Sequence, residues 1–290
     1  MTLTPVKNKL IAASLGLIVC QMLLAADTLF TCNYLGETCP GDTPVIFGKN
    51  IVSVEGINTH ACTFSPDGKM LVFSRYPDRK SYIMNYVDGN WTEPEEAFFK
   101  GKETSFTTNG KRIFYYSGGG EIYYNDKTES GWGSPIRLGS EVNTPETEYY
   151  PSVTEDGTLF FSRNGKWTEG RIMYSEYDNG QYSTPVDIGL PVNTGGALHA
   201  YVAPDKSYLL FNSPREGSYT KLDIWISFRT PDGKWTSPKN LGKTINSGAD
   251  AILCPTVTPD GKYMFFTRLN LSSNTGNVYW VSTRFFDKLK

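Results

Sequence analysis

Short apolar runs alternate with polar turns along the chain, and one arrangement of turn and run returns about every 40–50 residues. Its clearest copies place Asp-Gly before an apolar run that ends in arginine: Asp67-Gly68 to Arg75, Asp156-Gly157 to Arg163, and Asp260-Gly261 to Arg268. Two weaker copies begin at Asn109-Gly110 and Pro204-Asp205. Asp-Gly tolerates the positive φ of a tight hairpin turn, and a repeat of this length is typical of propellers and other repeat arrays. The pattern therefore predicts a series of β-hairpins built on one repeated unit.

The third copy predicts a unit of four strands. Residues 148–154 form the first strand, 159–162 the second, 171–176 the third and 182–188 the fourth. The fourth strand carries Pro185, which cannot donate to a neighbouring strand, so we expect it at the outer edge of the sheet. Each unit thus predicts one four-stranded antiparallel blade.

An aromatic residue follows the second turn of four copies: Trp91, Trp132, Tyr182 and Trp235. Because these residues repeat with the units, we interpret them as packing between blades. A carbohydrate-stacking role is the alternative interpretation.

The two ends of the repeated region complement each other. The fifth copy has a first strand at 254–257, a second at 263–267 and a third at 277–283, and no fourth strand follows. Residues 42–48 match the fourth-strand residues 183–189. A sheet left with three strands would expose an edge that invites aggregation. We therefore predict a five-bladed β-propeller over residues 42–290, in which the N-terminal strand completes the last blade. An open two-sheet sandwich would not explain the matching segment at the opposite end.

The phrase Ser65-Pro66-Asp67-Gly68-Lys69 with its following aromatic strand resembles the WD40-like (PD40) repeat of the TolB propeller, over nearly all of residues 42–290. The chain is also similar to an exported bacterial group of unknown function, with Tyr34-Leu35-Gly36 and the segment 223–229 as the matching features. The resemblance implies the propeller fold. A role in the Tol system is not implied, because only a short segment precedes the repeats. Other relatives of the repeat cap serine peptidases, but this chain has no Gly-x-Ser-x-Gly motif.

The N-terminal residues predict export. Lys7 and Lys9 precede an apolar stretch that ends at Ala25-Ala26, which is typical of a secretory signal peptide over residues 1–26. Residues 27–41 then form a linker, and the protein is expected to be periplasmic or secreted. An uncleaved membrane anchor is the main alternative, because the stretch is long enough to cross a bilayer. A lipoprotein signal would need a small residue before Cys20, where the chain has Val19.

Composition narrows the classes of partner and cofactor. The formal net charge of −2 gives no indication of a nucleic-acid surface, and 14% aromatic residues fit strands. With two histidines and no Cys-x-x-Cys pair, we expect no metal site and no cofactor. Cys32 and Cys39 could close a short loop, whereas Cys62 and Cys254 lie at offsets that face opposite sides of a sheet, so we expect no bond between them. A closed ring needs no partner for stability, and we expect a monomer.

Strand order assigns the loops of a propeller to two faces. The Asp-Gly turns and the turns between third and fourth strands share the first, which we call the turn face. The connections between blades and the loops between second and third strands share the second, the crossover face, where the copies differ. Variable loops on a rigid scaffold often carry binding residues. The candidates that we select at this face are His60, Arg75, Glu103, Glu148, Tyr149, Arg163, His199, Tyr201, Asp250 and Arg268.

These candidates differ in how strongly they indicate a ligand. First strands line the channel of a propeller, so we expect Arg75, Arg163 and Arg268 one ring outward from the channel residues. Arginine at one position in three repeats favours ion pairs between blades over ligand contact, because a ligand rarely needs rotational symmetry. His60 and His199 do not repeat and are stronger candidates, although a lone histidine is more often a hydrogen-bonded strand residue.

Two functions fit this sequence. The first is an exported, non-enzymatic propeller that binds a protein, peptide or glycan on the crossover face. The alternative is a carbohydrate-active enzyme, either a glycoside hydrolase or a lyase, that uses Glu103, Glu148 or Asp250. A hydrolase would need two carboxyl groups about 5–10 Å apart, one of them with a raised pKa.

Overall fold

The structure is a computed structural model that describes residues 34–290. The predicted signal peptide and most of the linker lie outside the described residues. Contacts divide the chain into residues 1–39 and residues 40–290, and the account below concerns the second unit. In the first unit, Cys39 is disulfide-bonded. The bond between Cys32 and Cys39 stays a prediction.

Residues 40–290 fold into groups of antiparallel strands. One parallel bridge, between Asn58 and Gly276, joins the first and last groups in a single nine-stranded sheet. The first group contains β2 (Asn58–Phe64), β3 (Met70–Tyr76), β4 (Lys80–Val87), β5 (Asn90–Trp91) and β6 (Glu95–Glu96). The second contains β7 (Lys102–Phe106), β8 (Arg112–Tyr116), β9 (Ile122–Thr128), β10 (Gly131–Trp132) and β11 (Ile136–Arg137). The next contains β12 (Glu148–Val153), β13 (Leu159–Arg163), β14 (Arg171–Ser175) and β17 (Val186–Asp187), with a small hairpin of β15 (Tyr177–Asp178) and β16 (Gln181–Tyr182).

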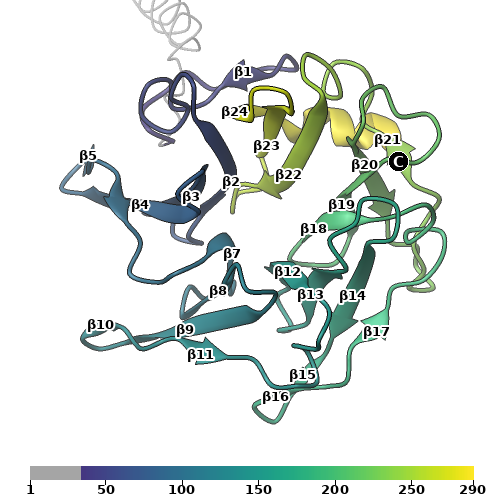
Figure 1. Ribbon diagram of the computed structural model, residues 1–290, viewed down its shortest axis with the longest axis horizontal. Coiled ribbons are helices and arrows are strands. Elements are labelled where there is room, and N and C mark those ends of the chain that lie inside the picture. Colours follow the sequence, from purple (N-terminus) through teal and green to yellow (C-terminus); the bar gives the residue numbers. More distant parts are fainter. Residues whose placement is uncertain (1–33) are drawn as a thin grey trace, which may run out of the picture. The chain divides into compact units, whose positions relative to one another are not determined.

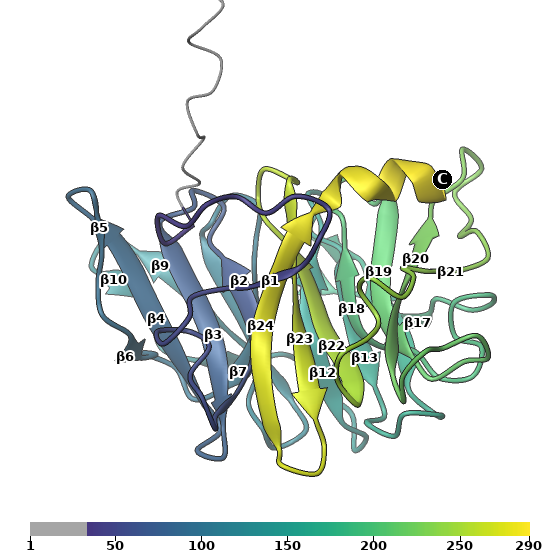
Figure 2. The ribbon, with the colours of Figure 1, turned by 90° about the horizontal axis from the view of Figure 1, so that it is seen from above.

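The remaining groups follow the same order. One contains β18 (Leu198–Val202), β19 (Tyr208–Ser213), β20 (Asp223–Phe228) and β21 (Lys239–Asn240). The last contains β22 (Ala251–Val257), β23 (Tyr263–Asn270), β24 (Thr275–Ser282) and β1 (Val45–Ile46). A 3₁₀-helix, η1 (Thr283–Leu289), follows β24 (Figure 2). Its Phe286 packs against Tyr208 of β19, with ring centroids 5.4 Å apart.

The long first strands surround a common centre. Figure 1 shows β2, β7, β12, β18 and β22 innermost, with the later strands of each group farther out. Each of these strands contacts the next, and β22 contacts β2, so the circuit is closed. Neighbouring groups pack face to face through separate apolar clusters, such as the one that joins Phe114 of β8 to Phe161 of β13. This is the architecture of a β-propeller.

The predicted pairing of the N-terminal segment with the last group is confirmed. Val45 pairs with Trp280 and Ile46 with Tyr279, and the Phe47 amide donates to the Val278 carbonyl at 2.9 Å. Phe47 is fully buried, with its ring centroid 4.8 Å from that of Phe265 and 5.3 Å from that of Trp280. The edge of β24 is therefore covered by a strand from the other end of the chain.

The fourth strand of the third group differs from the prediction. Instead of one strand over residues 182–188, the chain pairs at β16 and again at β17, with Ser183-Thr184-Pro185 between them. Pro185 has no N–H to donate, so the strand pairing is interrupted there, although Ser183 still donates to the Glu176 carbonyl at 2.9 Å and accepts from the Ser175 hydroxyl of β14. The outer edge of the group is consequently short.

Every first strand contains a bulge that the sequence did not reveal. The pairing register shifts by one residue after His60, Lys102, Tyr149, Leu198 and Leu253. The next residue in each strand has a left-handed backbone, with φ of 53°, 56°, 53°, 49° and 54° at Ala61, Glu103, Tyr150, His199 and Cys254. A bulge re-aims the side chains that flank it. The same bulge therefore recurs at the equivalent position of each first strand around the ring centre.

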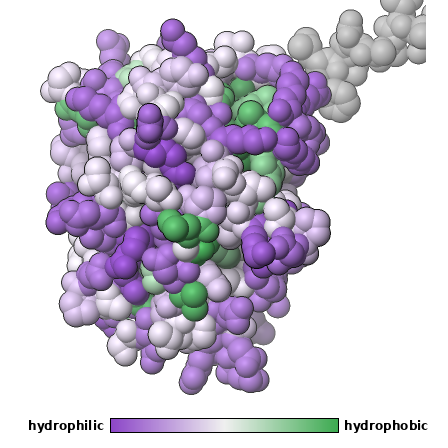
Figure 3. Space-filling model, turned by 90° about the vertical axis from the view of Figure 1, so that its right-hand side faces the viewer, coloured by the Kyte–Doolittle hydropathy of each residue, from purple (hydrophilic) through white to green (hydrophobic). Residues whose placement is uncertain are grey.

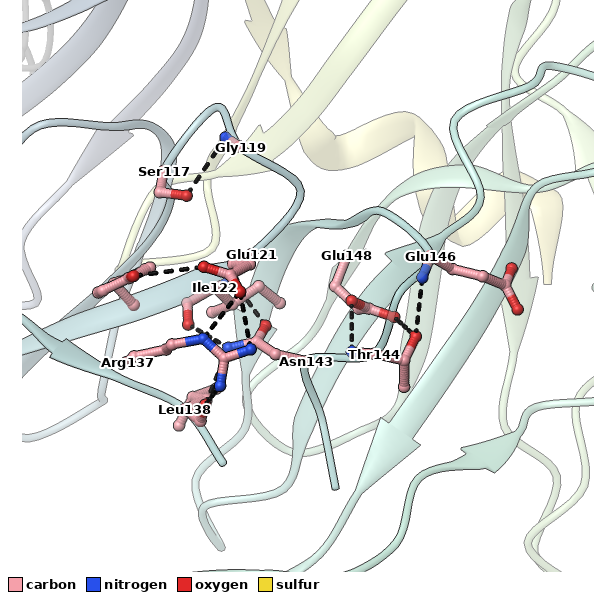
Figure 4. Close-up of polar contacts among 11 residues, drawn as sticks. Ser117, Gly119, Glu121, Ile122, Arg137, Leu138, Asn143, Thr144, Glu146 and Glu148 are labelled. Carbon is pink, nitrogen blue, oxygen red and sulfur yellow. Dashed lines mark hydrogen bonds and ion pairs between the residues drawn. The ribbon is translucent and has the colours of Figure 1, made fainter. Parts of the chain in front are cut away.

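In several groups, an asparagine from the connection to the next group hydrogen-bonds the backbone near the start of the third strand. Asn143 accepts from the Ile122 amide at 2.8 Å and donates to the Ile122 carbonyl at 2.9 Å (Figure 4). Asn193 does the same for Ile172, and Asn246 for Ile224. The side-chain amide has one acceptor and two donors, so it can replace a neighbouring strand at this point. We call these contacts the asparagine clamps.

Candidate binding site at the ring centre

Aromatic and polar side chains from different groups meet at the ring centre. Tyr149, Tyr150 and Leu198 belong to one buried cluster with Cys254 and Ala61. Cys62 and Cys254 are free buried thiols, as predicted. Because the bulged strands converge here, the side chains that follow come from four separate groups.

A continuous series of ring and cation–π contacts links the candidates His60, Tyr149 and His199. The His60 ring lies 5.2 Å from that of Tyr76, and Lys102 Nζ lies 4.4 Å from the Tyr76 centroid and 5.3 Å from that of Tyr116. The Tyr149 ring then lies 6.1 Å from that of Tyr116.

His199 closes the series. Its ring lies 5.5 Å from Tyr149 and 5.1 Å from Tyr150, edge to face in both cases. Trp167, half-buried, packs against the same buried cluster from the loop between β13 and β14. The structure therefore brings His60, Glu103, Tyr149 and His199 together around Lys102. We call this set, with Tyr76, Tyr116 and Trp167, the central cluster.

Several polar atoms of the central cluster are buried and have no hydrogen-bond partner among the described residues. They are His60 Nδ1, Glu103 Oε2 and His199 Nδ1. His60 is 6% exposed and Glu103 7% exposed. Buried polar atoms in native proteins are nearly always hydrogen-bonded, so each unpaired atom needs an explanation.

Burial also determines the protonation of this cluster. Burial lowers the pKa of His60 to about 3, with smaller contributions from Lys102 and His199, and lowers the pKa of His199 to about 4. Burial raises the pKa of Glu103, although the Lys102 charge opposes the shift. Burial lowers the pKa of Lys102, but the Glu103 charge and the Tyr76 hydroxyl outweigh it, and the net shift is upward. At neutral pH both imidazoles are uncharged and Lys102 is the local cation.

The repeated arginines serve the scaffold in a different way from the one we expected. Arg75 donates to the Ile51 carbonyl, and Arg268 donates to the Thr244 carbonyl at 2.9 Å. Arg163 donates to the Val142 carbonyl at 3.0 Å, and Arg215, which follows β19, donates to the Val192 carbonyl at 2.6 Å. Each carbonyl belongs to the connection that leads into the arginine's own group.

The guanidinium groups also stack on aromatic rings. Arg75 lies 4.7 Å from the Tyr82 centroid, Arg215 lies 4.8 Å from that of Phe211, and Arg268 lies 4.5 Å from that of Tyr279. The expectation of ion pairs between adjacent blades is wrong for Arg163, whose carboxylate partner, Glu148, lies in its own group. These arginines fasten each connection to the blade that it enters.

Glu148 is fully engaged within the scaffold. Its carboxylate is buried and accepts from Arg163 Nε at 2.8 Å, the Thr144 hydroxyl at 2.6 Å and the Thr144 amide at 3.0 Å. Figure 4 shows Glu148 and Thr144 facing each other beside the Asn143 clamp. This carboxylate holds the connection before β12 and has no oxygen free for a substrate.

Two further candidates lie apart from the central cluster. Asp250, directly before β22, accepts the Leu271 amide at 2.9 Å and so holds the loop between β23 and β24. Tyr201 packs with Tyr208 against the apolar cluster between the last two groups, with ring centroids 6.3 Å apart. Of the three carboxylates considered for catalysis, Glu103 is the one with a buried oxygen that has no hydrogen-bond partner among the described residues.

No group of three or more His, Cys, Asp or Glu side chains within residues 34–290 has an arrangement that could hold a metal ion. No helix in that same part of the chain is long and apolar enough to cross a membrane.

Surface hollows occur on the turn face, where we expected a uniform surface. A groove of about 550 Å³ lies beside Met70, Tyr86 and Trp132, between the first and second groups. Another of about 420 Å³ lies beside Tyr174, Arg229 and Trp235, between β14 and β20. Both have the same position relative to a turn tryptophan, so they follow from the repeated packing of neighbouring blades.

Sequence reasoning missed Lys102, Tyr116 and Tyr150. Lys102 occupies the register position of His60 and Tyr149, because each lies directly before a bulge. Aligning the copies by this position would have found Lys102. Tyr150 lies on the bulge itself, and no sequence pattern marked it.

Comparison with known proteins supports the fold. No protein-family model and no curated protein matches the chain. A solved structure of a protein assigned as TolB from Agrobacterium tumefaciens is 18% identical, with a TM-score of 0.51, over 78% of this chain and 77% of that one. TolB from Acinetobacter baumannii is 14% identical, with a TM-score of 0.50, over 77% of this chain and 57% of that one.

The fold is that of a TolB-like β-propeller. At these identities the likeness concerns the fold alone, and this chain spans little more than half of the second TolB protein. The fold part of the TolB resemblance is confirmed. The WD40-like repeat has no matching family model behind it.

Proposed function

We propose that the chain is an exported, five-bladed, non-enzymatic β-propeller that binds a protein, peptide or glycan at the crossover end of its channel. The observation that carries this proposal is the central cluster, in which unpaired buried polar atoms lie beside half-buried aromatic rings. Binding sites typically combine apolar walls with a few convergent polar groups. Export to the periplasm or beyond rests on the N-terminal sequence.

The five-blade assignment rests on the closed circuit of first strands and on the pairing of β1 with β24. A monomer is proposed because the ring closes on itself. The side of the molecule drawn in Figure 3 is largely hydrophilic, with small separate apolar patches. Such a surface differs from the broad apolar patch that marks many protein–protein interfaces.

The carbohydrate-active enzyme is the weaker candidate. A glycoside hydrolase needs two carboxyl groups with separate roles, whereas Arg163 and Thr144 occupy the Glu148 carboxylate. Turnover of a polysaccharide that is lost in Glu103→Gln would reverse this preference.

Photo-crosslinking from the two faces tests the proposal. A benzoylphenylalanine at Tyr219, 58% exposed in the crossover-face loop between β19 and β20, is expected to trap a partner in living cells of the source organism. The same group at Tyr177, 38% exposed on the turn face, is the matched control and is expected to trap none. The proposal requires the Tyr219 adduct to disappear in a Trp167→Ala, Tyr116→Ala background. Adducts from Tyr177 alone, or from neither site, would overturn it.

A further inference from the structure

The two grooves of the turn face are lined by equivalent residues but differ in charge. Trp132 lines the first groove, between the first and second groups, with Lys127 Nζ 6.0 Å from its ring centroid. Trp235 lines the second groove, between β14 and β20, with the Arg229 guanidinium 6.0 Å from its centroid. Repeated packing of the blades accounts for this likeness. A difference in charge between the grooves therefore needs a separate explanation.

The cations that line the second groove each have a partner within the protein. The pairs are Lys206 with Asp156, Lys234 with Asp232, and Arg229 with the Gly233 carbonyl. Glu176 also lines this groove and offsets the positive charge of Arg229. The positive charge of the second groove is therefore balanced.

The first groove keeps an excess of positive charge. The charged residues that line it are Asp67, Lys69 and Lys127, and all three are exposed. Neither lysine has an ion-pair partner within residues 34–290. Asp67 Oδ1 accepts the Ser65 hydroxyl at 2.5 Å and the Lys69 amide at 3.1 Å. Two ammonium groups and one carboxylate leave one positive charge, so the groove favours an anionic ligand.

Aromatic and amide side chains complete the walls of the first groove. Tyr86 and Trp132 are half-buried, and Phe98 stacks on Trp132 with ring planes 13° apart and centroids at 5.3 Å. The Asn85 side-chain amide and Asn109 Nδ2 also lie at the groove and make no hydrogen bond with other described residues. A sugar ring presents C–H groups on its faces and hydroxyl groups at its edge. Walls that combine rings with unpaired amides suit such a ligand.

The backbone on both sides of the groove is already paired. Tyr86 of β4 pairs with Trp91 of β5, and Lys127 of β9 pairs with Trp132 of β10. Extended peptides are commonly bound as an added strand at an open sheet edge. The groove offers side chains and no open edge of this kind, so a sugar fits it better than an extended peptide.

We propose that the first groove binds a hexuronic acid residue of an acidic glycan. The carboxylate of such a residue is attached directly to the sugar ring. A ring that lies against Trp132 therefore brings its carboxylate within reach of Lys127, while its hydroxyls pair with Asn85 and Asn109. The groove volume of about 550 Å³ lies within the range of about 300–1,000 Å³ that is usual for small-ligand sites. This site is on the face opposite the one in the proposed function and does not depend on it.

Calorimetric titration of the purified protein tests the ligand class. The probes are trisaccharides of galacturonate, mannuronate and glucuronate, the methyl ester of each, and a glutamate-rich peptide. At least one uronate is expected to bind, with its uncharged methyl ester about fivefold weaker at low ionic strength, which is the size of an exposed ion pair. Equal affinity for acid and ester, binding of the peptide alone, or no binding of any uronate would overturn the inference.

Lysine variants locate the carboxylate. The double variant Lys69→Gln, Lys127→Gln is expected to bind the uronate and its ester almost equally, with the affinity for the ester unchanged. Lys127→Arg keeps the charge and should keep the preference for the acid. Lys234→Gln removes a lysine from the second groove and is the matched control, which should also keep the preference. A double variant that still prefers the acid as strongly as the wild type would overturn the inference.

Tryptophan variants locate the sugar ring. Trp132→Ala is expected to weaken binding of the uronate and its ester alike by about tenfold, as expected for the loss of an aromatic anchor. Trp235→Ala in the second groove, and Glu155→Gln, an exposed turn-face change that lines neither groove, should leave affinity unchanged. Because Trp132 also packs against Phe98 and Phe106, thermal melts accompany every variant. If Trp132→Ala fails to fold, the exposed lysines decide the outcome, and a folded Trp132→Ala with wild-type affinity would contradict the proposed site.

Discussion

At the scale of single residues, the two buried histidines make stability depend on pH. Their pKa values in the folded protein are about 3 for His60 and about 4 for His199, below the ordinary value of 6.5. Between these values the unfolded chain binds more protons than the folded one, so the free energy of unfolding falls as pH falls below about 6.5. Each histidine contributes a slope of up to about 1.4 kcal/mol per pH unit. Glu103, whose pKa is raised, opposes this slope, and Lys102 keeps its charge throughout.

Urea unfolding at several pH values between about 7 and 5 measures this effect. The wild-type protein is expected to lose stability across the range, and His199→Gln is expected to show a distinctly shallower slope. Glu155→Gln should keep the wild-type slope. A His199→Gln slope equal to that of the wild type would show that this imidazole titrates normally.

At the scale of elements, the asparagine clamps couple each connection to the preceding blade. Asn143→Ala removes the acceptor of the Ile122 amide and one of the two donors to the Ile122 carbonyl, which keeps the Leu138 amide. The Ile122 amide is then left without a partner beside a buried position, so we expect a loss of about 1–3 kcal/mol in the free energy of unfolding. Asn143→Asp should also be destabilising, because a carboxylate would face the Ile122 and Leu138 carbonyls. Asn90→Ala, at an exposed position in a hairpin, is the control and should change stability by less than about 0.5 kcal/mol. Equal melting temperatures for Asn143→Ala and Asn90→Ala would rule out the clamp's role.

The sequence was most informative about the strands and their pairing. Asp-Gly turns and apolar runs marked the long strands, and the match between residues 42–48 and 183–189 predicted the pairing of β1 with β24. The bulges escaped prediction because Ala61, Glu103, Tyr150, His199 and Cys254 share a backbone conformation and no side-chain property. None is glycine, so no residue type marked the left-handed positions. Convergence of the strands at the ring centre is a property of the assembled ring.

At the scale of the whole molecule, the same convergence explains what could be predicted of the site. Strand order placed His60, Glu103, Tyr149 and His199 in one set with Glu148, Tyr201 and Asp250. The structure brings the first four together, whereas the last three have other partners. Apart from the Arg163–Glu148 pair, the partners of Glu148, Asp250 and the arginines were not deducible, because they are backbone groups and hydroxyls of loops and connections whose course depends on packing. A candidate carboxylate and a loop-holding carboxylate look alike in a sequence.

Closure of the ring through β1 gives the last prediction. Phe47 and Phe114 are both fully buried between neighbouring groups, so replacing either with alanine should cost about 3–5 kcal/mol. Only Phe47 belongs to the segment that covers β24, where its amide also bonds the Val278 carbonyl. Phe47→Ala should therefore loosen β1 and expose the β24 edge, whereas Phe114→Ala leaves every edge paired.

The two variants are compared at matched stability by choosing the temperature at which each is equally folded. Phe47→Ala is expected to form concentration-dependent aggregates that bind thioflavin, because an unpaired edge strand templates further pairing. Phe114→Ala should unfold without such growth. Since both lose the same side chain from the same kind of interface, any difference between them measures edge protection rather than packing. Equal aggregation would mean that η1 and the neighbouring groups protect β24 without β1, and that ring closure by the N-terminal strand contributes stability alone.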